Sequence, residues 1–92
     1  MKIIQSPTFE RFVKKQPSQF KSKLDQIINE ITQDPKCGQA KKGDLSDIRV
    51  YKFKENNTLY LLSYRLIGEE LQLIMLGTHE NFYRELKRYI KR

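Results

Sequence analysis

The residues best suited to chemistry lie in one short segment, Gly77 to Arg84, directly after an apolar run. This segment holds the single histidine of the chain, His79, and a tyrosine four residues later, Tyr83. An imidazole exchanges protons near neutral pH and a phenol can donate a hydrogen bond, so the pair is suited to acid–base work. A strand that ends at His79 and a helix that follows it would place both groups at the same edge of the sheet. The structural alternative is that His79 caps the helix and Tyr83 packs beside Phe82.

The length and charge of the chain limit the number of domains and the classes of partner that we can expect. With 92 residues the chain forms one small domain, expected to span residues 1–92. The 18 Lys and Arg residues exceed the 11 Asp and Glu residues, which gives a net charge of +7. Such a surface favours a polyanionic partner: nucleic acid, an anionic membrane or an acidic protein. A basic protein without such a partner is the alternative.

Cysteine and histidine usage argues against disulfide and metal chemistry. Cys37 is the only cysteine, which excludes an internal disulfide, and one cysteine with one histidine is no ligand set for structural zinc. We therefore expect no metal and no cofactor. The N-terminal residues lack the apolar stretch of a signal peptide, and no run approaches the roughly 20 apolar residues of a membrane span. A cytoplasmic protein without a membrane partner is expected.

The first half of the chain predicts a strand and two helices. Residues 2–5 are short and partly β-branched, as in an edge strand. Ser6 and Pro7 form a helix-start signal, and this helix should end near Lys15, because Gln16 precedes Pro17. A second helix from Pro17 to about residue 34 has one apolar stripe, which we expect to pack on a sheet: Phe20, Leu24, Ile27, Ile28 and Ile31.

The second half predicts a loop, three strands and a helix. Residues 34–47 have no periodicity, and their lysines, Lys41 and Lys42, either meet a phosphate backbone or lie in a solvated connector. Strands are expected at 48–54, 59–66 and 71–76, with turns at Asn56-Asn57 and Gly68, and a helix at 80–91. The predicted fold is therefore α+β, with two N-terminal helices packed on a small, mainly antiparallel sheet of about four strands. The order is strand, helix, helix, strand, strand, strand, helix.

Three features in this order resemble a known family. They are the helix pair before a strand meander, the run from Gly43 to Lys54 that leads into strand 59–66, and the apolar strand that ends in Gly77-Thr78-His79. Together they are similar to the RelE/ParE superfamily, the toxins of type II toxin-antitoxin pairs. The RelE branch implies a metal-independent endoribonuclease that cuts messenger RNA in the ribosomal A site. In that reaction the substrate's own 2′-hydroxyl attacks the adjacent phosphate, so the protein supplies a base, an acid and positive charge.

The resemblance also assigns catalytic roles to individual residues. The Tyr-Lys-x-Lys pattern of RelE matches Tyr51 to Lys54, which gives Lys52 and Lys54 the role of basic groups at the scissile phosphate. The alternative is a pair of exposed lysines that protects a strand edge. The family places an arginine after the tyrosine equivalent to Tyr60, where this chain has Leu61. Arg65, four residues on and on the same strand face, is the candidate replacement, and the alternative is a surface charge or one that pairs with the antitoxin.

The family likeness extends to the segment from Gly77 to Arg84. RelE has an arginine at the position of His79, and other ribosome-dependent members have histidine. Tyr83 matches a family tyrosine, with a spacing shorter by two residues, and would orient the 2′-hydroxyl or stack on a base. Expected contacts to messenger or ribosomal RNA come from basic side chains elsewhere: Lys41, Lys42, Arg49, Arg84, Lys87 and Arg88.

The resemblance implies a partner and leaves other functions open. A cognate acidic antitoxin should neutralise the toxin in a hetero-oligomer, by laying a helix or strand over the basic face. The ParE branch uses the same fold to poison DNA gyrase without nuclease activity, and this is the main alternative. A catalytically inert RNA-binding module would also explain the charge.

Overall fold

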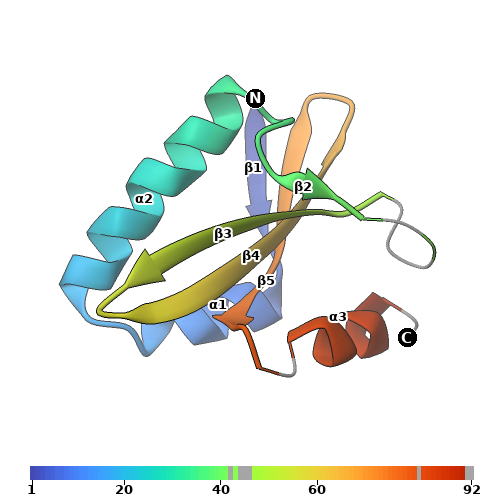
Figure 1. Cartoon of the computed structure of the whole chain (residues 1–92). Helices are drawn as coiled ribbons and strands as arrows, with labels where there is room; N and C mark the ends of the chain where they lie inside the picture. The colour runs from blue at the N-terminus through green and yellow to red at the C-terminus, as the bar shows by residue number, and fades with distance from the viewer. Residues whose placement is uncertain (42, 44–46, 81, 91–92) are drawn as a thin grey trace.

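The computed structural model describes residues 1–41, 43, 47–80 and 82–90, and it contains a sheet with helices on both faces (Figure 1). Along the chain the elements are β1 (Lys2–Gln5), α1 (Pro7–Lys14), α2 (Ser18–Gln33), β2 (Gln39–Ala40), β3 (Arg49–Glu55), β4 (Thr58–Ile67), β5 (Glu70–Thr78) and α3 (Phe82–Ile90). The α+β class is confirmed, as are both N-terminal helices and the helix after the last strand.

The sheet has five strands in the order β1-β5-β4-β3-β2. β1 runs parallel to β5, and all other neighbours are antiparallel. β1 is thus an edge strand, as its sequence predicts. The turn between β3 and β4 uses left-handed backbone at Asn56 and Asn57, with φ of 51° and 65°, which matches the twist of a two-residue hairpin. Gly68, with φ of 60°, serves the turn between β4 and β5.

The prediction of about four strands, with a plain loop at residues 34–47, was wrong in one respect. Within that range the short strand β2 pairs with β3, Gln39 opposite Val50 and Ala40 opposite Arg49. A strand of two exposed residues has no hydrophobic alternation to detect in the sequence. It forms because the outer edge of β3 offers backbone donors and acceptors to the returning chain.

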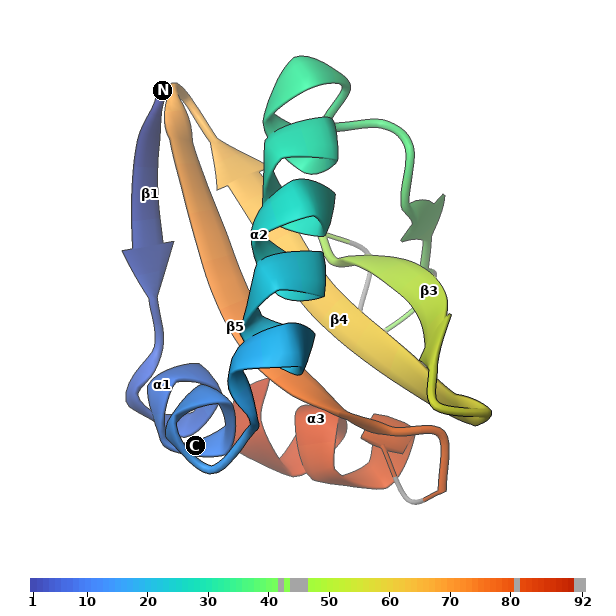
Figure 2. The ribbon, with the colours of Figure 1, turned by 90° about the vertical axis from the view of Figure 1, so that its left-hand side faces the viewer.

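The helices α1 and α2 cover one face of the sheet (Figure 2). α1 begins as predicted: the Ser6 hydroxyl accepts a hydrogen bond from the amide of Phe9 at 3.0 Å, and Pro7 occupies the first turn. Burial of apolar side chains between helices and sheet is the main stabilising contribution here. The buried residues of this first core are Phe9, Phe20, Leu24, Ile27, Ile31, Phe53, Leu62, Tyr64, Leu71, Leu73 and Leu76.

The helix α3 packs on the opposite face of the sheet and forms a second core. Phe82 and Leu86 from α3 join buried strand residues there, which are Ile48, Val50, Leu61, Ile74 and Met75. Ile48 and Val50 have the same strand parity as Lys52 and Lys54, so both pairs belong to this face. α3 covers the half of β3 that carries the apolar pair, whereas both lysines are exposed. One strand face is therefore buried at one end and open at the other.

Candidate active site

The exposed end of the α3 face carries the two lysines of the Tyr51 to Lys54 motif. Lys52 lies opposite Leu61 of β4, and Lys54 lies opposite Leu59. Because the lysines are two residues apart on one strand, their Cα atoms are about 6.7 Å apart and their side chains leave the same face. Leu61 is fully buried beneath α3, so Lys52 borders the second core and Lys54 lies further out.

His79 follows β5 at the same end of the sheet. Its amide donates to the carbonyl oxygen of Leu59 at 3.2 Å, which extends the ladder between β4 and β5 by one position. Leu59 of β4 thus lies between Lys54 on β3 and His79 at the end of β5. The backbones of β3 and β5 are about 9.5 Å apart there. We call Lys52, Lys54, Leu59 and His79 the basic end of the sheet. Leu59 was not among the residues singled out from sequence, since only the strand register reveals its position.

Gly77 and Phe82 fix where α3 begins beside this group. Gly77 lies opposite Leu61, in the same row as Lys52. A Cβ atom at position 77 would lie 3.7 Å from the Phe82 ring, so the first residue of α3 packs directly over Gly77. The amide of Phe82 donates to the carbonyl oxygen of His79 at 3.4 Å, which makes the turn from β5 into α3 tight. The turn therefore holds His79 outside the covered part of the sheet.

Tyr83 contacts the region between β2 and β3. Its half-buried ring packs edge-on against Phe82, with 5.4 Å between ring centroids, and the Lys41 ammonium nitrogen lies 4.9 Å from the Tyr83 ring centroid. That distance is within cation–π range. Lys41 is itself tied to β3, because its amide donates to the carbonyl oxygen of Ile48. Lys41 and Tyr83 therefore form a second cationic and aromatic pair on the α3 side.

The structure does not bring Arg65 to the basic end of the sheet. Arg65 lies on the same face of β4 as Leu61 and Leu59, as expected. It is, however, four residues beyond Leu61, or about 13 Å along the strand, and six residues beyond Leu59, or about 20 Å. The apolar cluster under α3 occupies the space between. The Nε of Arg65 donates instead to the Gln72 side-chain oxygen at 2.8 Å.

The remaining basic candidates divide between the two faces. Arg49 has the parity of Tyr51 and Phe53, and its guanidinium donates to the carbonyl oxygens of Lys36 and Gly38 at 3.2 and 2.8 Å. Arg49 thus holds the segment between α2 and β2 in place. Three further candidates are exposed on α3, namely Arg84, Lys87 and Arg88. Lys42 lies outside the described residues.

Within residues 1–41, 43, 47–80 and 82–90, no group of three or more His, Cys, Asp or Glu side chains is arranged to hold a metal ion. In the same part of the chain, no helix has the length and apolar character needed to cross a membrane.

The arrangement as a whole suits an anionic ligand that spans the end of the sheet. Two ammonium groups on one strand and an imidazole two strands away can approach one phosphate from two sides, with the apolar Leu59 between them. Lysines act there as point charges on flexible stems, and the imidazole can give or accept a proton.

Solved structures show what kind of fold this is. The chain is similar to the toxin in the intact Escherichia coli RelBE toxin-antitoxin complex, with a TM-score of 0.68, 22% identity, and coverage of 86% of this chain and 96% of that chain. It also matches the isolated E. coli RelE toxin, with a TM-score of 0.65, 22% identity, and coverage of 95% and 96%. A conserved hypothetical protein from Helicobacter pylori matches at a TM-score of 0.52 and 24% identity, covering 86% and 94%. At these identities the likeness establishes a RelE-like fold.

The family follows from a comparison with family models. The model described as the ParE-like toxin of the type II bacterial toxin-antitoxin system matches residues 3–87. The chain belongs to this family of toxins, within the RelE/ParE superfamily. A comparison with curated proteins found no match.

Proposed function

We propose that this toxin is a ribosome-dependent endoribonuclease that cuts messenger RNA in the A site and thereby stops translation in the cytoplasm. The observation that carries the proposal is the placement of Lys52, Lys54 and His79 together at the open end of one sheet face. Clustered exposed cations beside a proton-transfer group are what cleavage of a phosphodiester by its own 2′-hydroxyl requires.

The reaction balances without a protein nucleophile. A base removes the proton of the 2′-hydroxyl, the 2′-oxygen bonds to phosphorus, and the bond from phosphorus to the 5′-oxygen breaks. An acid protonates that 5′-oxygen, and the products are a 2′,3′-cyclic phosphate and a 5′-hydroxyl. We assign the two lysines to the negative charge that grows on the phosphorane, and His79 to one of the proton transfers.

Tyr83 and the other basic residues are assigned to RNA binding and orientation. We assign the exposed cations of α3, Arg84, Lys87 and Arg88, to contacts with phosphates of ribosomal or messenger RNA. We assign Tyr83, with Lys41 over one side of its ring, to orienting the 2′-hydroxyl or to stacking on a base.

We further propose that a cognate acidic antitoxin binds the chain in a toxin-antitoxin hetero-oligomer. The E. coli relative was solved in a complex described as an intact RelBE toxin-antitoxin complex. The net charge of +7 supports an acidic partner by electrostatic complementarity.

A gyrase poison is the second candidate, and Leu61 favours it. Leu61 occupies the strand position where the RelE resemblance expects an arginine, and it is fully buried under α3. A charged side chain there would be buried in the apolar cluster, which is costly, so this position contributes packing and not charge. The matching family model is also ParE-like.

Two assays with purified chain separate these functions. Messenger RNA programmed on intact ribosomes is incubated with the protein and mapped by primer extension, and DNA gyrase supercoiling is measured in parallel. The nuclease proposal predicts new 5′ ends within the A-site codon and normal supercoiling. Intact transcripts together with inhibited supercoiling would replace it with the gyrase proposal.

A further inference from the structure

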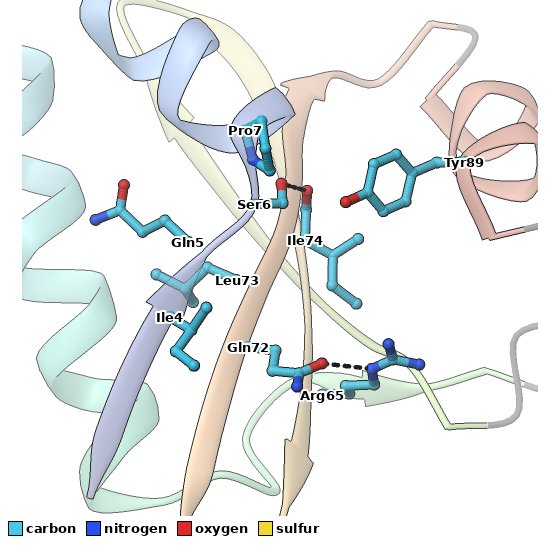
Figure 3. Close-up of a pocket in the computed structure, with 9 residues that line it drawn as sticks. All are labelled: Ile4, Gln5, Ser6, Pro7, Arg65, Gln72, Leu73, Ile74 and Tyr89. Carbon is cyan, nitrogen blue, oxygen red and sulfur yellow. Dashed lines mark hydrogen bonds between the residues drawn. The ribbon is translucent and has the colours of Figure 1, made fainter. Parts of the chain in front are cut away.

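A pocket of about 260 Å³ opens on the α3 side of the sheet, where β1, β4 and β5 meet the last turn of α3 (Figure 3). Figure 3 shows the side chains of Arg65 and Tyr89 coming to it from a strand and from the helix, while Ile4 approaches from β1. Its lining includes Ile4, Arg65, Gln72, Ile74 and Tyr89. This pocket lies at the far end of β4 from the basic end of the sheet.

A chain of side-chain hydrogen bonds holds Arg65 in position. Its Nε donates to the Gln72 oxygen at 2.8 Å, and the Gln72 amide nitrogen donates to the Glu70 carboxylate at 2.7 Å. Gln72 therefore stands between the guanidinium and the carboxylate. Among the described residues, the bond to Gln72 is the one side-chain hydrogen bond that Arg65 makes, so its outer N–H groups remain to bind a ligand. A held guanidinium loses little entropy on binding a planar anion.

Apolar side chains surround this guanidinium. Ile74 is buried, Tyr89 is half-buried and Ile4 is 37% exposed. Strand register adds Ile67, which lies opposite Glu70 and so shares the sheet face of Arg65 and Gln72, whereas the exposed Ile3 and Leu66 lie opposite Leu71 on the other face. Exposed apolar side chains gathered around an arginine are typical of a protein-binding surface.

The surroundings argue for a protein ligand over RNA. A nucleic-acid backbone is bound by several cations spaced along its phosphates. Here the pocket lining contains one guanidinium, and its walls combine polar residues (Gln5, Ser6 and Gln72) with apolar ones such as Ile4, Ile74 and Tyr89. A polypeptide segment with an acidic side chain beside an apolar one would supply an anion for the guanidinium and an apolar group for these walls.

We propose that this pocket, the Arg65 pocket, anchors the antitoxin at a point separate from the catalytic residues. The occupant is an antitoxin segment that carries an aspartate or glutamate beside an apolar residue. Its carboxylate pairs with the outer N–H groups of Arg65, and the apolar side chain fills the space between Ile4 and Tyr89. This inference rests on the antitoxin partner named under the proposed function. It replaces the catalytic role that the sequence suggests for Arg65.

The test measures antitoxin affinity and RNA cleavage on the same variants. The probe is the protein encoded by the small reading frame next to the toxin gene, purified after co-expression, and its Kd for the full chain is measured by calorimetry. Arg65→Gln and Ile4→Asp should each weaken binding by about 10- to 100-fold. Arg11→Gln, which removes the same charge from the exposed side of α1, is the matched control and should bind normally.

Cleavage of ribosome-bound messenger RNA decides between anchoring and catalysis. The inference predicts that Arg65→Gln and Ile4→Asp, with unfolding temperatures near that of the control, cleave at the rate of the unmodified chain. It is overturned if both bind the antitoxin as Arg11→Gln does, or if Arg65→Gln loses cleavage and keeps its affinity. If the unmodified chain cleaves no RNA, the nuclease proposal fails, whereas the affinity comparison still tests the pocket.

Discussion

The hydroxyl oxygen of Tyr64 lies 2.9 Å from the amide nitrogen of Gly38, so a core residue of β4 binds the backbone of the segment that follows α2. The same hydroxyl donates to the carbonyl oxygen of Pro35 at 2.6 Å. Arg49 adds a bond to the carbonyl oxygen of Gly38 from β3. These contacts tie the connection from α2 to β2 onto the sheet, although that connection has little apolar surface of its own.

Gly38→Ala should destabilise the fold by about 1 to 3 kcal/mol, as expected for overpacking. A Cβ atom at position 38 would lie 2.6 Å from the Tyr64 hydroxyl oxygen and 2.8 Å from the Tyr64 ring. The Tyr64 side chain is fully buried, and its hydroxyl is held by two hydrogen bonds, so it has little room to move. Urea unfolding measures the loss. Gly77→Ala is the matched control, because among the described residues its Cβ would meet only the Phe82 ring, at 3.7 Å. It should change stability by less than about 0.5 kcal/mol. Equal stability of both variants would contradict the packing described here.

The stability of the fold should fall above pH 10, and Tyr64 contributes to this fall. Burial raises the pKa of the Tyr64 hydroxyl from 10.0 to about 12. In the unfolded chain a tyrosine ionises near pH 10, so between pH 10 and 12 the folded state retains a proton that the unfolded state has lost. The stabilisation is therefore complete below pH 10 and is lost as the pH rises through 12.

Tyr64→Phe isolates this contribution. The variant loses the bonds to Pro35 and Gly38, which should cost about 1 to 3 kcal/mol at neutral pH. Its free energy of unfolding should then fall less steeply between pH 10 and 12 than that of the unmodified chain. Parallel curves for the two proteins would mean that another group causes the alkaline loss.

Lys52→Gln and Lys54→Gln should each lower RNA cleavage on ribosomes by about 100-fold, because each removes a charge that stabilises the phosphorane. Both side chains are exposed, so the unfolding temperature should stay nearly unchanged. Lys21→Gln and Lys23→Gln, on the exposed side of α2, remove the same charge elsewhere. If these controls lose as much activity as the β3 variants, then net charge and not position is responsible.

Tyr83→Phe separates the phenol from the ring. The variant keeps the edge-on contact with Phe82 and the approach of Lys41, so folding should be unaffected. If the hydroxyl orients the 2′-oxygen, the cleavage rate in single-turnover experiments should fall by about 10-fold or more. An unchanged rate for Tyr83→Phe with a reduced rate for Tyr83→Ala would assign the residue to stacking.

Much of the fold follows from local patterns in the sequence. The apolar stripe from Phe20 to Ile31 predicts α2, Ser6 and Pro7 predict the start of α1, and the paired asparagines predict the first hairpin. β2 could not be predicted, since two exposed residues become a strand only by pairing with β3. Likewise, no pattern marks Tyr64 as the residue that fixes the loop after α2.

The candidate site was predictable in residue type but only partly in position. Alternation places Lys52, Lys54, Leu61 and Arg65 correctly on one sheet face. Alternation does not show which part of that face a later helix covers. α3 packs across its middle, and this packing separates Arg65 from the lysines and leaves Leu59 beside them.

Single-turnover cleavage of messenger RNA by the double variant Lys54→Gln/His79→Gln, on intact ribosomes, tests the central claim most directly. We predict that the unmodified chain leaves a 2′,3′-cyclic phosphate at the cut. The folded double variant, still bound to ribosomes, should cleave at least about 1,000-fold more slowly. Cleavage by the double variant at the unmodified rate would contradict the assignment of catalysis to the basic end of the sheet.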